Sequence, residues 1–343
     1  MASKIPRRRI GDSLVSAIGL GCMGMSIPVS TGKNDEECLR VLTRAADLGI
    51  NFWVTSDSYG PEVNEELIGR WFKESGRRDE IFLCTKFGPR IVDGKPQVSG
   101  KPEYVKQACE ASLRRLHTDH IDLYSQHRVD TQTPIEITVK AMAQLKNEGK
   151  IRHLGLSECS ARTLRRASAV HEIAAAEMEF SPFALEMESP ETDFLDTARA
   201  LGVKIVAYSP LGRGFLTGAI KSRADFDPMD PRIMFPRFAE ENFSGNLKLV
   251  GIFEDMAREK GCTPGQVALA WVLSQGDDFI PIPSTKHVKY LEENAGAVNV
   301  DFSRGDDERI RKAIDAIGGA KGSRYPGAFA AMCFADSPEL EHE

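Results

Sequence analysis

Apolar residues along this chain follow two alternating patterns, short continuous runs and longer stretches in which they recur with the period of a helix. Eight short runs stand out, and each leads into a longer amphipathic stretch. They span residues 18–21, 50–54, 81–85, 121–124, 151–156, 174–179, 203–207 and 279–282. Short apolar runs are typical of buried parallel strands, whereas the longer period indicates helices. Repeated strand–helix units of this number predict a closed (β/α)8 barrel, the TIM-barrel fold.

Residues at the ends of the amphipathic stretches support their assignment as helices. Asn34 precedes one stretch, with Glu37 three positions later and Gly49 after the last turn. Thr263 and Pro264 precede another. Asparagine and threonine side chains cap the free N–H groups of a first turn, and proline fits the first helical position. These residues therefore predict where two of the helices begin.

Three segments lie outside the repeat. Residues 9–15 predict a β-hairpin that covers the bottom of the barrel. Residues 212–245, rich in Gly, Pro, Arg and Phe, are too long for an ordinary loop, so we expect a lid or binding loop there. The C-terminal tail is similar in character. Because no linker separates a second domain, we expect one domain over 1–343, with a barrel core at about 8–318 and a tail at 319–343.

The composition and charge of the chain argue against several classes of protein. Hydrophobic residues make up 41% of the 343 positions, and the formal net charge is -6. An acidic chain gives no support for a nucleic-acid or anionic-membrane partner, because phosphates are bound by clustered Lys and Arg. No stretch reaches the ~18 apolar residues of a membrane span, and the N-terminus lacks the apolar region of a secretory signal. Seven scattered cysteines without a C-x-x-C pair indicate neither a disulfide framework nor a metal site. We expect a cytoplasmic protein.

One motif suggests a different fold. Residues 19–24, Gly-Leu-Gly-Cys-Met-Gly, match the G-x-G-x-x-G pattern of Rossmann dinucleotide-binding domains. In those domains the motif opens directly into a helix, whose N-terminus binds the pyrophosphate. Here residues 27–32 follow as a loop rich in Pro, Ser and Gly. The context therefore argues against a Rossmann fold.

Polar residues stand at the C-terminal ends of the predicted strands, where barrel enzymes build their sites. The second run leads to Tyr59, the third ends in Lys86 and the fourth in His127. The next three runs end near Ser157, Glu158, Glu177, Tyr208 and Ser209. Each side chain alone is explained by core packing or by a paired buried group. Together around one opening, they indicate a site.

Tyrosine, lysine and histidine at one opening suit proton donation to a carbonyl oxygen. A neighbouring ammonium lowers the pKa of a tyrosine from its usual ~10, and an imidazole can hold the carbonyl. Hydride must come from a cofactor, because no side chain donates it. Residues 284–286, Ser-Thr-Lys, precede a predicted helix and form a candidate anion site. An ordinary helix cap beside a surface lysine has the same pattern, so this motif alone leaves both interpretations open.

Taken together, these motifs resemble the aldo-keto reductase superfamily, in particular its single-chain reductases from fungi, plants and bacteria. The resemblance covers about residues 8–318. It rests on segments in the family's order, at residues 49–60, 85–88, 121–127, 155–158, 207–214, 284–286 and 291–294.

The resemblance implies NADPH-dependent reduction of a small-molecule aldehyde or ketone. Tyr59 would be the general acid, Lys86 would tune it and His127 would orient the carbonyl. The implied cofactor residues near the nicotinamide are Ser157, Glu158, Glu177 and Tyr208. Those along the rest of the cofactor are Gly21, Cys22, Met23, Ser209, Pro210, Leu211, Arg213, Ser284, Thr285, Lys286, His287, Glu293 and Asn294. Lys286 favours NADPH over NADH, and the aromatic residues favour an aryl or bulky apolar substrate.

The chain departs from the family pattern at Val54, where the family has an aspartate that pairs with the lysine. We therefore expect Lys86 to lack an ionic partner, to shift toward its neutral form and to lower the tyrosine pKa less. Asp57 is a poor substitute, because it is expected to point along the loop. Two interpretations remain open: a reductase with slowed turnover, or a non-catalytic NADP(H)-binding sensor or accessory protein.

Two further departures concern the cofactor. Glu177 replaces a glutamine that would hydrogen-bond the nicotinamide carboxamide, so we expect altered cofactor binding. His287 replaces an arginine, and a mostly uncharged imidazole would weaken binding of the 2'-phosphate.

Overall fold

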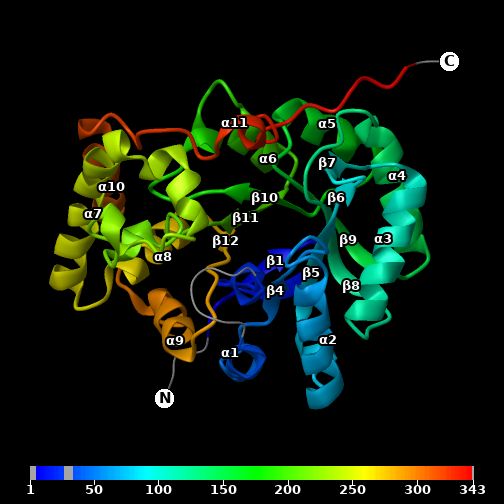
Figure 1. Cartoon of the computed structure of the whole chain (residues 1–343), viewed down its shortest axis with the longest axis horizontal. Helices are drawn as coiled ribbons and strands as arrows, with labels where there is room; N and C mark the ends of the chain where they lie inside the picture. The colour runs from blue at the N-terminus through cyan, green and yellow to red at the C-terminus, as the bar shows by residue number, and fades with distance from the viewer. Residues whose placement is uncertain (1–4, 27–33, 342–343) are drawn as a thin grey trace.

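The computed structural model describes residues 5–26 and 34–341, and eight parallel strands lie at its centre (Figure 1). In chain order they are β3 Leu20–Gly21, β4 Phe52–Val54, β5 Phe82–Phe87, β8 Ile121–Gln126, β9 Ile151–Ser157, β10 Ala175–Glu179, β11 Lys204–Tyr208 and β12 Phe279–Pro281. Hydrogen-bonded neighbours follow the order β12-β11-β10-β9-β8-β5-β4-β3. All eight predicted runs are strands.

Contacts between the first and last strands close the sheet into a barrel. The Gly19 N–H donates to the Pro281 carbonyl at 2.9 Å, and the Gly21 N–H donates to the Pro283 carbonyl at 3.1 Å. Gly21 also pairs with Ser284 in a parallel bridge. The predicted (β/α)8 barrel is confirmed.

Helices surround the strands on all sides (Figure 1). They are α1 Asp35–Asp47, α2 Val63–Ser75, α3 Pro102–Arg115, α4 Ile135–Asn147, α5 Ala161–Val170, α6 Phe194–Ala200, α7 Glu240–Lys260, α8 Pro264–Ser274, α9 Val288–Gly296, α10 Arg304–Ala316 and α11 Gly327–Ala330. The predicted caps are confirmed: the Asn34 side chain accepts from the Glu37 N–H, and Thr263 forms a capping box with Gln266. None of the helices in the described ranges is long and apolar enough to cross a membrane.

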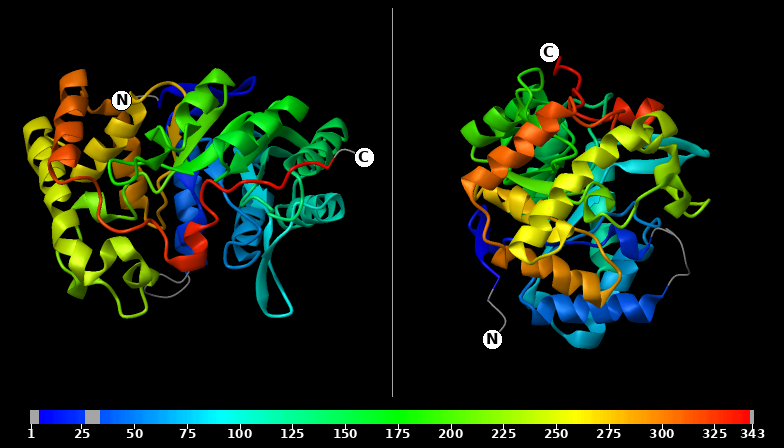
Figure 2. Two further views of the ribbon diagram at one scale, coloured as in Figure 1. Left: turned by 90° about the horizontal axis from the view of Figure 1, so that it is seen from above. Right: turned by 90° about the vertical axis from the view of Figure 1, so that its left-hand side faces the viewer.

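The predicted N-terminal hairpin is present as β1 Arg7–Ile10 and β2 Ser13–Ser16. Its fully buried Ile10 and Val15 pack against inward-facing barrel residues such as Phe52. In both views of Figure 2 the hairpin lies at the end of the barrel opposite to α11. A second hairpin, β6 Pro89–Val92 and β7 Lys95–Val98, follows β5 and was not predicted.

The segment predicted as a loop at 212–245 is more ordered than expected. It contains the short helices η4 Phe215–Thr217, η5 Arg223–Asp225, η6 Pro231–Met234 and η7 Pro236–Phe238, and α7 already begins at Glu240. Its residues Phe226, Phe238 and Phe243 are buried and lie in ring contact with one another or with Phe215. These rings therefore belong to the core, which removes one reason for expecting an aryl substrate.

The C-terminal tail returns to the barrel. Ala335 pairs with Cys159 in a parallel bridge just after β9, and the Ser337 hydroxyl accepts from the Ile135 N–H at 2.6 Å. Figure 2 shows the tail crossing the molecule beside α11. The tail thus adds side chains to the end of the barrel where the parallel strands finish.

Candidate active site

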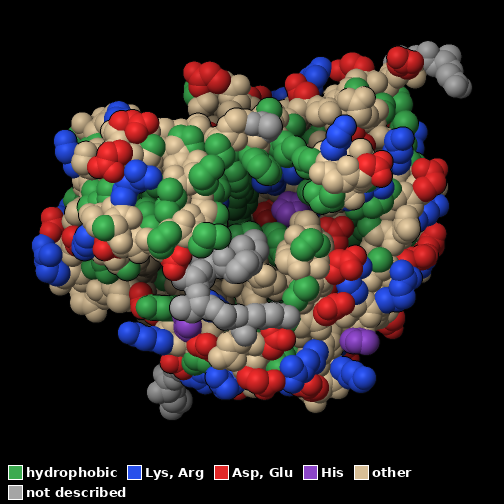
Figure 3. Space-filling view, in the orientation of Figure 1, with side chains coloured by type: hydrophobic (Ala, Val, Ile, Leu, Met, Phe, Trp, Pro, Cys, Tyr) green, Lys and Arg blue, Asp and Glu red, His purple; other side chains and the backbone are tan. Residues whose placement is uncertain are grey.

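Strand periodicity brings polar side chains into the barrel. Successive residues of a strand face opposite sides, so Lys86 faces inward with Phe82 and Cys84, which pack in the barrel interior. On β10, Glu177 faces inward with Ala175 for the same reason. Figure 3 shows the molecule in the orientation of Figure 1, with a hollow near the middle of the face that is drawn. Hydrophobic side chains lie along one rim of the hollow, and acidic and histidine side chains lie inside it.

The three predicted catalytic side chains meet at this place. The Lys86 Nζ lies 4.9 Å from the centre of the Tyr59 ring. The rings of Tyr59 and His127 are 5.7 Å apart in an edge-to-face arrangement. Lys86 is fully buried, whereas Tyr59 and His127 are half-buried. The arrangement places an ammonium and an imidazole on two sides of one phenol.

Lys86 has an ionic partner, contrary to the expectation from Val54. Its Nζ lies 3.0 Å from Oε2 of Glu177, in an ion pair whose side chains are 0% and 7% exposed. Burial lowers the pKa of Lys86, but the Glu177 carboxylate and the neighbouring Tyr59 raise it by more, so the net pKa lies above the ordinary value. The expectation of an unpaired lysine that shifts toward its neutral form was therefore wrong.

Val54 and Asp57 do not supply that partner. Val54 is 1% exposed and packs among apolar interior residues. The carboxylate of Asp57 accepts from the Ser56 hydroxyl, and its backbone N–H donates to the Lys86 carbonyl. The expectation that Asp57 is no substitute for an aspartate at Val54 agrees with these contacts.

The pKa of Tyr59 also differs from the sequence-based expectation. Burial raises it to about 12, Glu177 raises it as well, and Lys86 and Arg128 lower it. The neighbouring ammonium therefore acts in the expected direction, but burial outweighs it. The consequence is a phenol that stays protonated at neutral pH and has a proton to donate.

His127 is held by two serine hydroxyls that the sequence pattern did not single out. Its Nδ1 lies 3.1 Å from the Ser56 hydroxyl and 3.3 Å from that of Ser58. Burial and the nearby Lys86 and Arg128 hold the pKa of His127 well below its usual value, so the ring is neutral. If the hydroxyls donate to Nδ1, the ring proton is on Nε2 and available to a carbonyl. Both serines belong to the motif at 49–60, which was the available signal.

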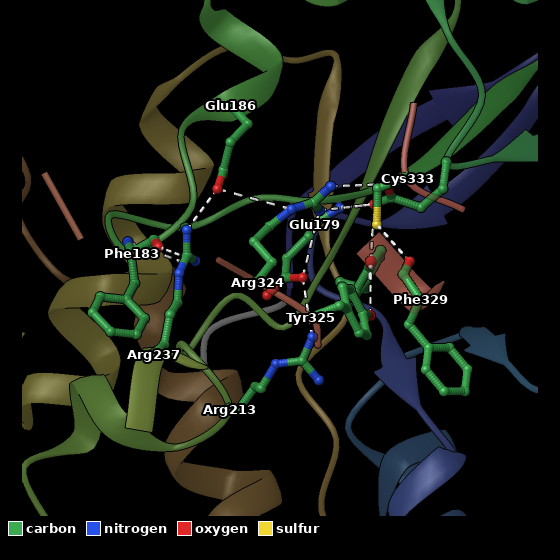
Figure 4. Close-up of polar contacts among 12 residues, drawn as sticks. Glu179, Phe183, Glu186, Arg213, Arg237, Arg324, Tyr325, Phe329 and Cys333 are labelled. Atoms are coloured by element: carbon green, nitrogen blue, oxygen red, sulfur yellow. Dashed lines mark hydrogen bonds and ion pairs between the residues drawn. The ribbon is translucent and has the colours of Figure 1, made fainter. Parts of the chain in front are cut away.

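The tail supplies a second group of residues that sequence reasoning missed. Arg324 is 6% exposed, and its two terminal nitrogens each donate to a carboxylate oxygen of Glu158 at 2.9 Å. Figure 4 shows Arg324 between Glu179 and Glu186, and its nitrogens lie 3.4 and 3.9 Å from their carboxylate oxygens. Burial raises the pKa of Glu158, but Arg324, Arg128 and Tyr208 together lower it by more, so Glu158 is ionised.

Tyr208 and Arg213 are tied to the same group. The Tyr208 hydroxyl donates to Glu158 at 2.8 Å and lies 3.1 Å from the hydroxyl of Tyr325. Arg213 donates to Glu179 at 3.1 Å, and its guanidinium lies over the ring of Tyr325 (Figure 4). These contacts join the ends of three strands, the segment after β11 and the tail into one wall of the site.

Backbone strain is concentrated here. Glu158, Ser209 and Arg213 have φ of 50°, 50° and 58°, a region that residues other than glycine rarely adopt. Each follows β9 or β11 at the end of the barrel where the site lies. Strained residues persist where surrounding structure enforces them, and they gather at functional sites.

The predicted cofactor residues from the two ends of the chain lie side by side. Gly21 pairs with Ser284, the Gly24 N–H donates to the Ser284 hydroxyl at 3.1 Å, and the Cys22 N–H donates to the Val54 carbonyl. Met23 is 40% exposed and begins a short helix, η1 Met23–Met25. The predicted site at residues 21–23 is thus continuous with the one at 284–287.

The start of α9 has the groups of an anion site, but a carboxylate also lies beside it. The Thr285 hydroxyl accepts from the His287 N–H at 3.0 Å, and Lys286 lies between them in sequence. His287 Nδ1, however, lies 2.5 Å from a carboxylate oxygen of Glu37 on α1. A carboxylate beside a phosphate site was not expected from the sequence.

The other predicted cofactor residues lie on α9 or just after β11. Glu293 accepts from the Thr263 hydroxyl at 2.7 Å, and Asn294 is 7% exposed. Pro210 is buried and Leu211 half-buried after β11. The described ranges contain no group of three or more His, Cys, Asp or Glu side chains that could hold a metal ion.

Comparison with known proteins decides the family. The aldo/keto reductase family model matches residues 17–315. This chain belongs to the aldo/keto reductase family. It is 49% identical to the aldo-keto reductase yakc, named for NADP(+), of Schizosaccharomyces pombe over 339 residues, which is 98% of this chain and 99% of that one. It is also 49% identical to the aldo-keto reductase str7 of Strobilurus tenacellus, over 98% of this chain and 99% of that one.

Solved structures of other aldo/keto reductases have the same fold. A glycerol dehydrogenase from Gluconobacter oxydans aligns with a TM-score of 0.83 and 26% identity, covering 96% of this chain and all of that one. The holo form of an aldo-keto reductase from Bacillus halodurans aligns with a TM-score of 0.72 and 27% identity, over 94% and 98%. The family resemblance inferred from the motifs is confirmed.

Proposed function

We propose that this aldo/keto reductase reduces an aldehyde or ketone to an alcohol with NADPH, using Tyr59 as the general acid. The observation that carries the proposal is the charged, buried Lys86 beside the phenol of Tyr59, with neutral His127 on another side. A proton donor, a group that stabilises its anion and a carbonyl holder thus share one opening. Membership of the family supports carbonyl reduction in general.

The donor set fits NADPH. Ser284, Thr285 and Lys286 offer hydroxyls and a cation at the N-terminus of α9, where backbone N–H groups favour an anion. Ser157 at the end of β9 and Tyr208 at the end of β11 would hold the nicotinamide. When bound, NADPH supplies the hydride that no side chain can donate. The name of the relative yakc, which includes NADP(+), supports this choice.

Three side chains have separate roles in the rest of the reaction. Tyr59 gives its proton to the carbonyl oxygen as negative charge develops there. Lys86 stays charged and stabilises the phenolate that Tyr59 leaves behind. His127 donates from Nε2 and orients the same carbonyl oxygen, while Ser56 and Ser58 hold its ring.

The ion pair between Lys86 and Glu177 removes the ground for expecting slowed turnover from Val54, which was an unpaired Lys86. An aryl or bulky apolar substrate stays a prediction, and so does a cytoplasmic location. Arg128 is half-buried and donates to the His127 carbonyl at 2.8 Å and to the Ser157 hydroxyl at 3.4 Å, so it adds a positive charge to the same opening.

The test is NADPH oxidation with a generic aldehyde such as 4-nitrobenzaldehyde. We expect Tyr59→Phe to lower kcat by roughly 10²–10⁴-fold, the usual worth of general acid catalysis, with NADPH affinity little changed. Tyr124→Phe is the matched control, because Tyr124 is buried in the outer core, where its hydroxyl donates to the Val105 carbonyl at 3.4 Å. Its kcat should match that of the wild type.

Two other outcomes would contradict the proposed carbonyl reduction. If NADPH binds but no carbonyl is reduced, and Tyr59→Phe changes nothing, the alternative of a non-catalytic NADP(H)-binding protein is favoured. If calorimetry detects no NADPH binding, both functions are excluded.

A further inference from the structure

We propose that Glu177 is the positioning residue that holds Lys86 charged and in place beside Tyr59, supplying from β10 the carboxylate that Val54 on β4 lacks. Compared with the family pattern, the carboxylate that pairs with Lys86 is then on β10 instead of β4. The departures at positions 54 and 177 therefore compensate for each other. The inference rests on the proposed function, and it assigns Glu177 a task other than binding the cofactor.

The geometry of the pair supports this role. Lys86 on β5 and Glu177 on β10 are separated by β8 and β9 on one side of the ring and by four strands on the other. Their side chains nevertheless meet inside the barrel, Nζ to Oε2 at 3.0 Å. The pair therefore spans the interior, and neither group is exposed enough for water to replace its partner.

No other carboxylate in the part of the chain that the structure describes forms an ion pair with Lys86. The groups that act on its charge are Tyr59, Cys84, Glu177, Cys22, His127 and Asp57. Burial raises the pKa of both thiols and of Tyr59 to about 12, so they are neutral at pH 7. The carboxylate of Asp57 accepts from the Ser56 hydroxyl and not from the Lys86 ammonium. Glu177 thus provides the balancing negative charge.

The physical chemistry of buried ions explains why positions 54 and 177 depend on each other. A buried ammonium without a partner loses its proton or destabilises the fold, and a buried carboxylate without a partner gains a proton or destabilises the fold. A neutral glutamine at position 177 would leave Lys86 unpaired as long as position 54 is valine. An aspartate at position 54 would introduce a second carboxylate around one ammonium as long as position 177 is glutamate.

The experiment is a double-mutant cycle on Val54 and Glu177, read by kcat and by NADPH affinity. We expect Glu177→Gln to lower kcat by roughly 10²–10⁴-fold with NADPH affinity changed only a few-fold. Val54→Asp added to Glu177→Gln should return kcat to within about ten-fold of the wild type. Val54→Asp alone should lower kcat, because two carboxylates then compete for Lys86.

Two controls separate positioning from general damage. Glu136→Gln removes a carboxylate from the ion pair with Arg166, at the outside of the barrel, and should leave kcat unchanged. In a Lys86→Met background, Glu177→Gln should have no further effect on kcat. The pH profile adds a third readout: the loss of activity with rising pH should begin at lower pH in Glu177→Gln, because an unpaired Lys86 loses its proton sooner.

Two results would overturn the inference: a Glu177→Gln enzyme within about three-fold of wild-type kcat, or a Val54→Asp enzyme at least ten-fold faster than wild type. If the wild type reduces no carbonyl, the proposed function fails, and urea unfolding then tests the pair alone. Val54→Asp should restore stability that Glu177→Gln removes, and absence of that rescue would overturn the pairing as well.

Discussion

At the scale of single residues, Asp57 has a carboxyl group whose environment disfavours its charge. Burial raises its pKa to about 7, and Glu65 adds to the effect, whereas Arg115 lowers it. Because the folded pKa lies above the unfolded one, the protonated carboxyl favours folding, and this contribution is lost as the pH rises from about 4 through about 7. We expect Asp57→Asn to be more stable than the wild type at about pH 8 and equally stable at about pH 4, as measured by urea unfolding.

An exposed aspartate is the control for that prediction. Asp301 lies on the surface after α9, and Asp301→Asn should leave the free energy of unfolding close to that of the wild type. Equal stabilities of Asp57→Asn and wild type at both pH values would show that burial does not disfavour the Asp57 charge.

At the scale of elements, the tail contributes a charged residue to the inside of the site. Arg324 neutralises Glu158, which is fully buried, and contacts Glu179 and Glu186 from the same guanidinium. Carboxylates from the ends of β9 and β10 and from the short helix η3 Glu186–Glu188 therefore meet at Arg324, while Arg213 and Arg237 also pair with Glu179 and Glu186. The tail is held in place by this charge as well as by its apolar contacts.

Removal of the Arg324 guanidinium should destabilise the folded protein. We expect Arg324→Met to lower the free energy of unfolding by about 3–5 kcal/mol, because it leaves Glu158 as a buried charge without its partner. Arg304→Met is the control: its guanidinium is 93% exposed and pairs with Glu308 at the surface, where an ion pair contributes about 0–1 kcal/mol. Chemical denaturation measures both, and equal costs for the two variants would contradict a stabilising role of Arg324.

Element prediction from sequence was accurate where the signal was local. The barrel strands were recognised because each is a buried run, and the caps at Asn34 and Thr263 because their residues act within one turn. The hairpin β6–β7 was missed because its residues are half-buried or exposed and lack an apolar pattern. Asp93-Gly94 at its turn, both with positive φ, was the usable signal.

At the scale of the whole molecule, we predict a single cooperative unfolding transition, which tests the expected single domain. Trp53 and Trp71 pack in one core cluster and Trp271 in another, so tryptophan fluorescence samples both sides of the barrel. Helix content measured by circular dichroism should change over the same denaturant range. Two separated transitions would show that the halves, or the tail, unfold independently.

The sequence by itself determined the barrel, its family and the meeting of Tyr59, Lys86 and His127, because each depends on short-range patterns or on motifs at strand ends. It did not reveal the partner of Lys86. Val54 and Glu177 each appeared as a defect when judged alone, and they lie on different strands, far apart in the chain.

Only the closed barrel decides which inward side chains face each other across its interior. Closure places Glu177 3.0 Å from Lys86 and brings Arg324 from the tail to Glu158. A buried charge must be balanced by whichever opposite charge lies within a few ångströms, and that distance is set by tertiary structure, not by position along the chain.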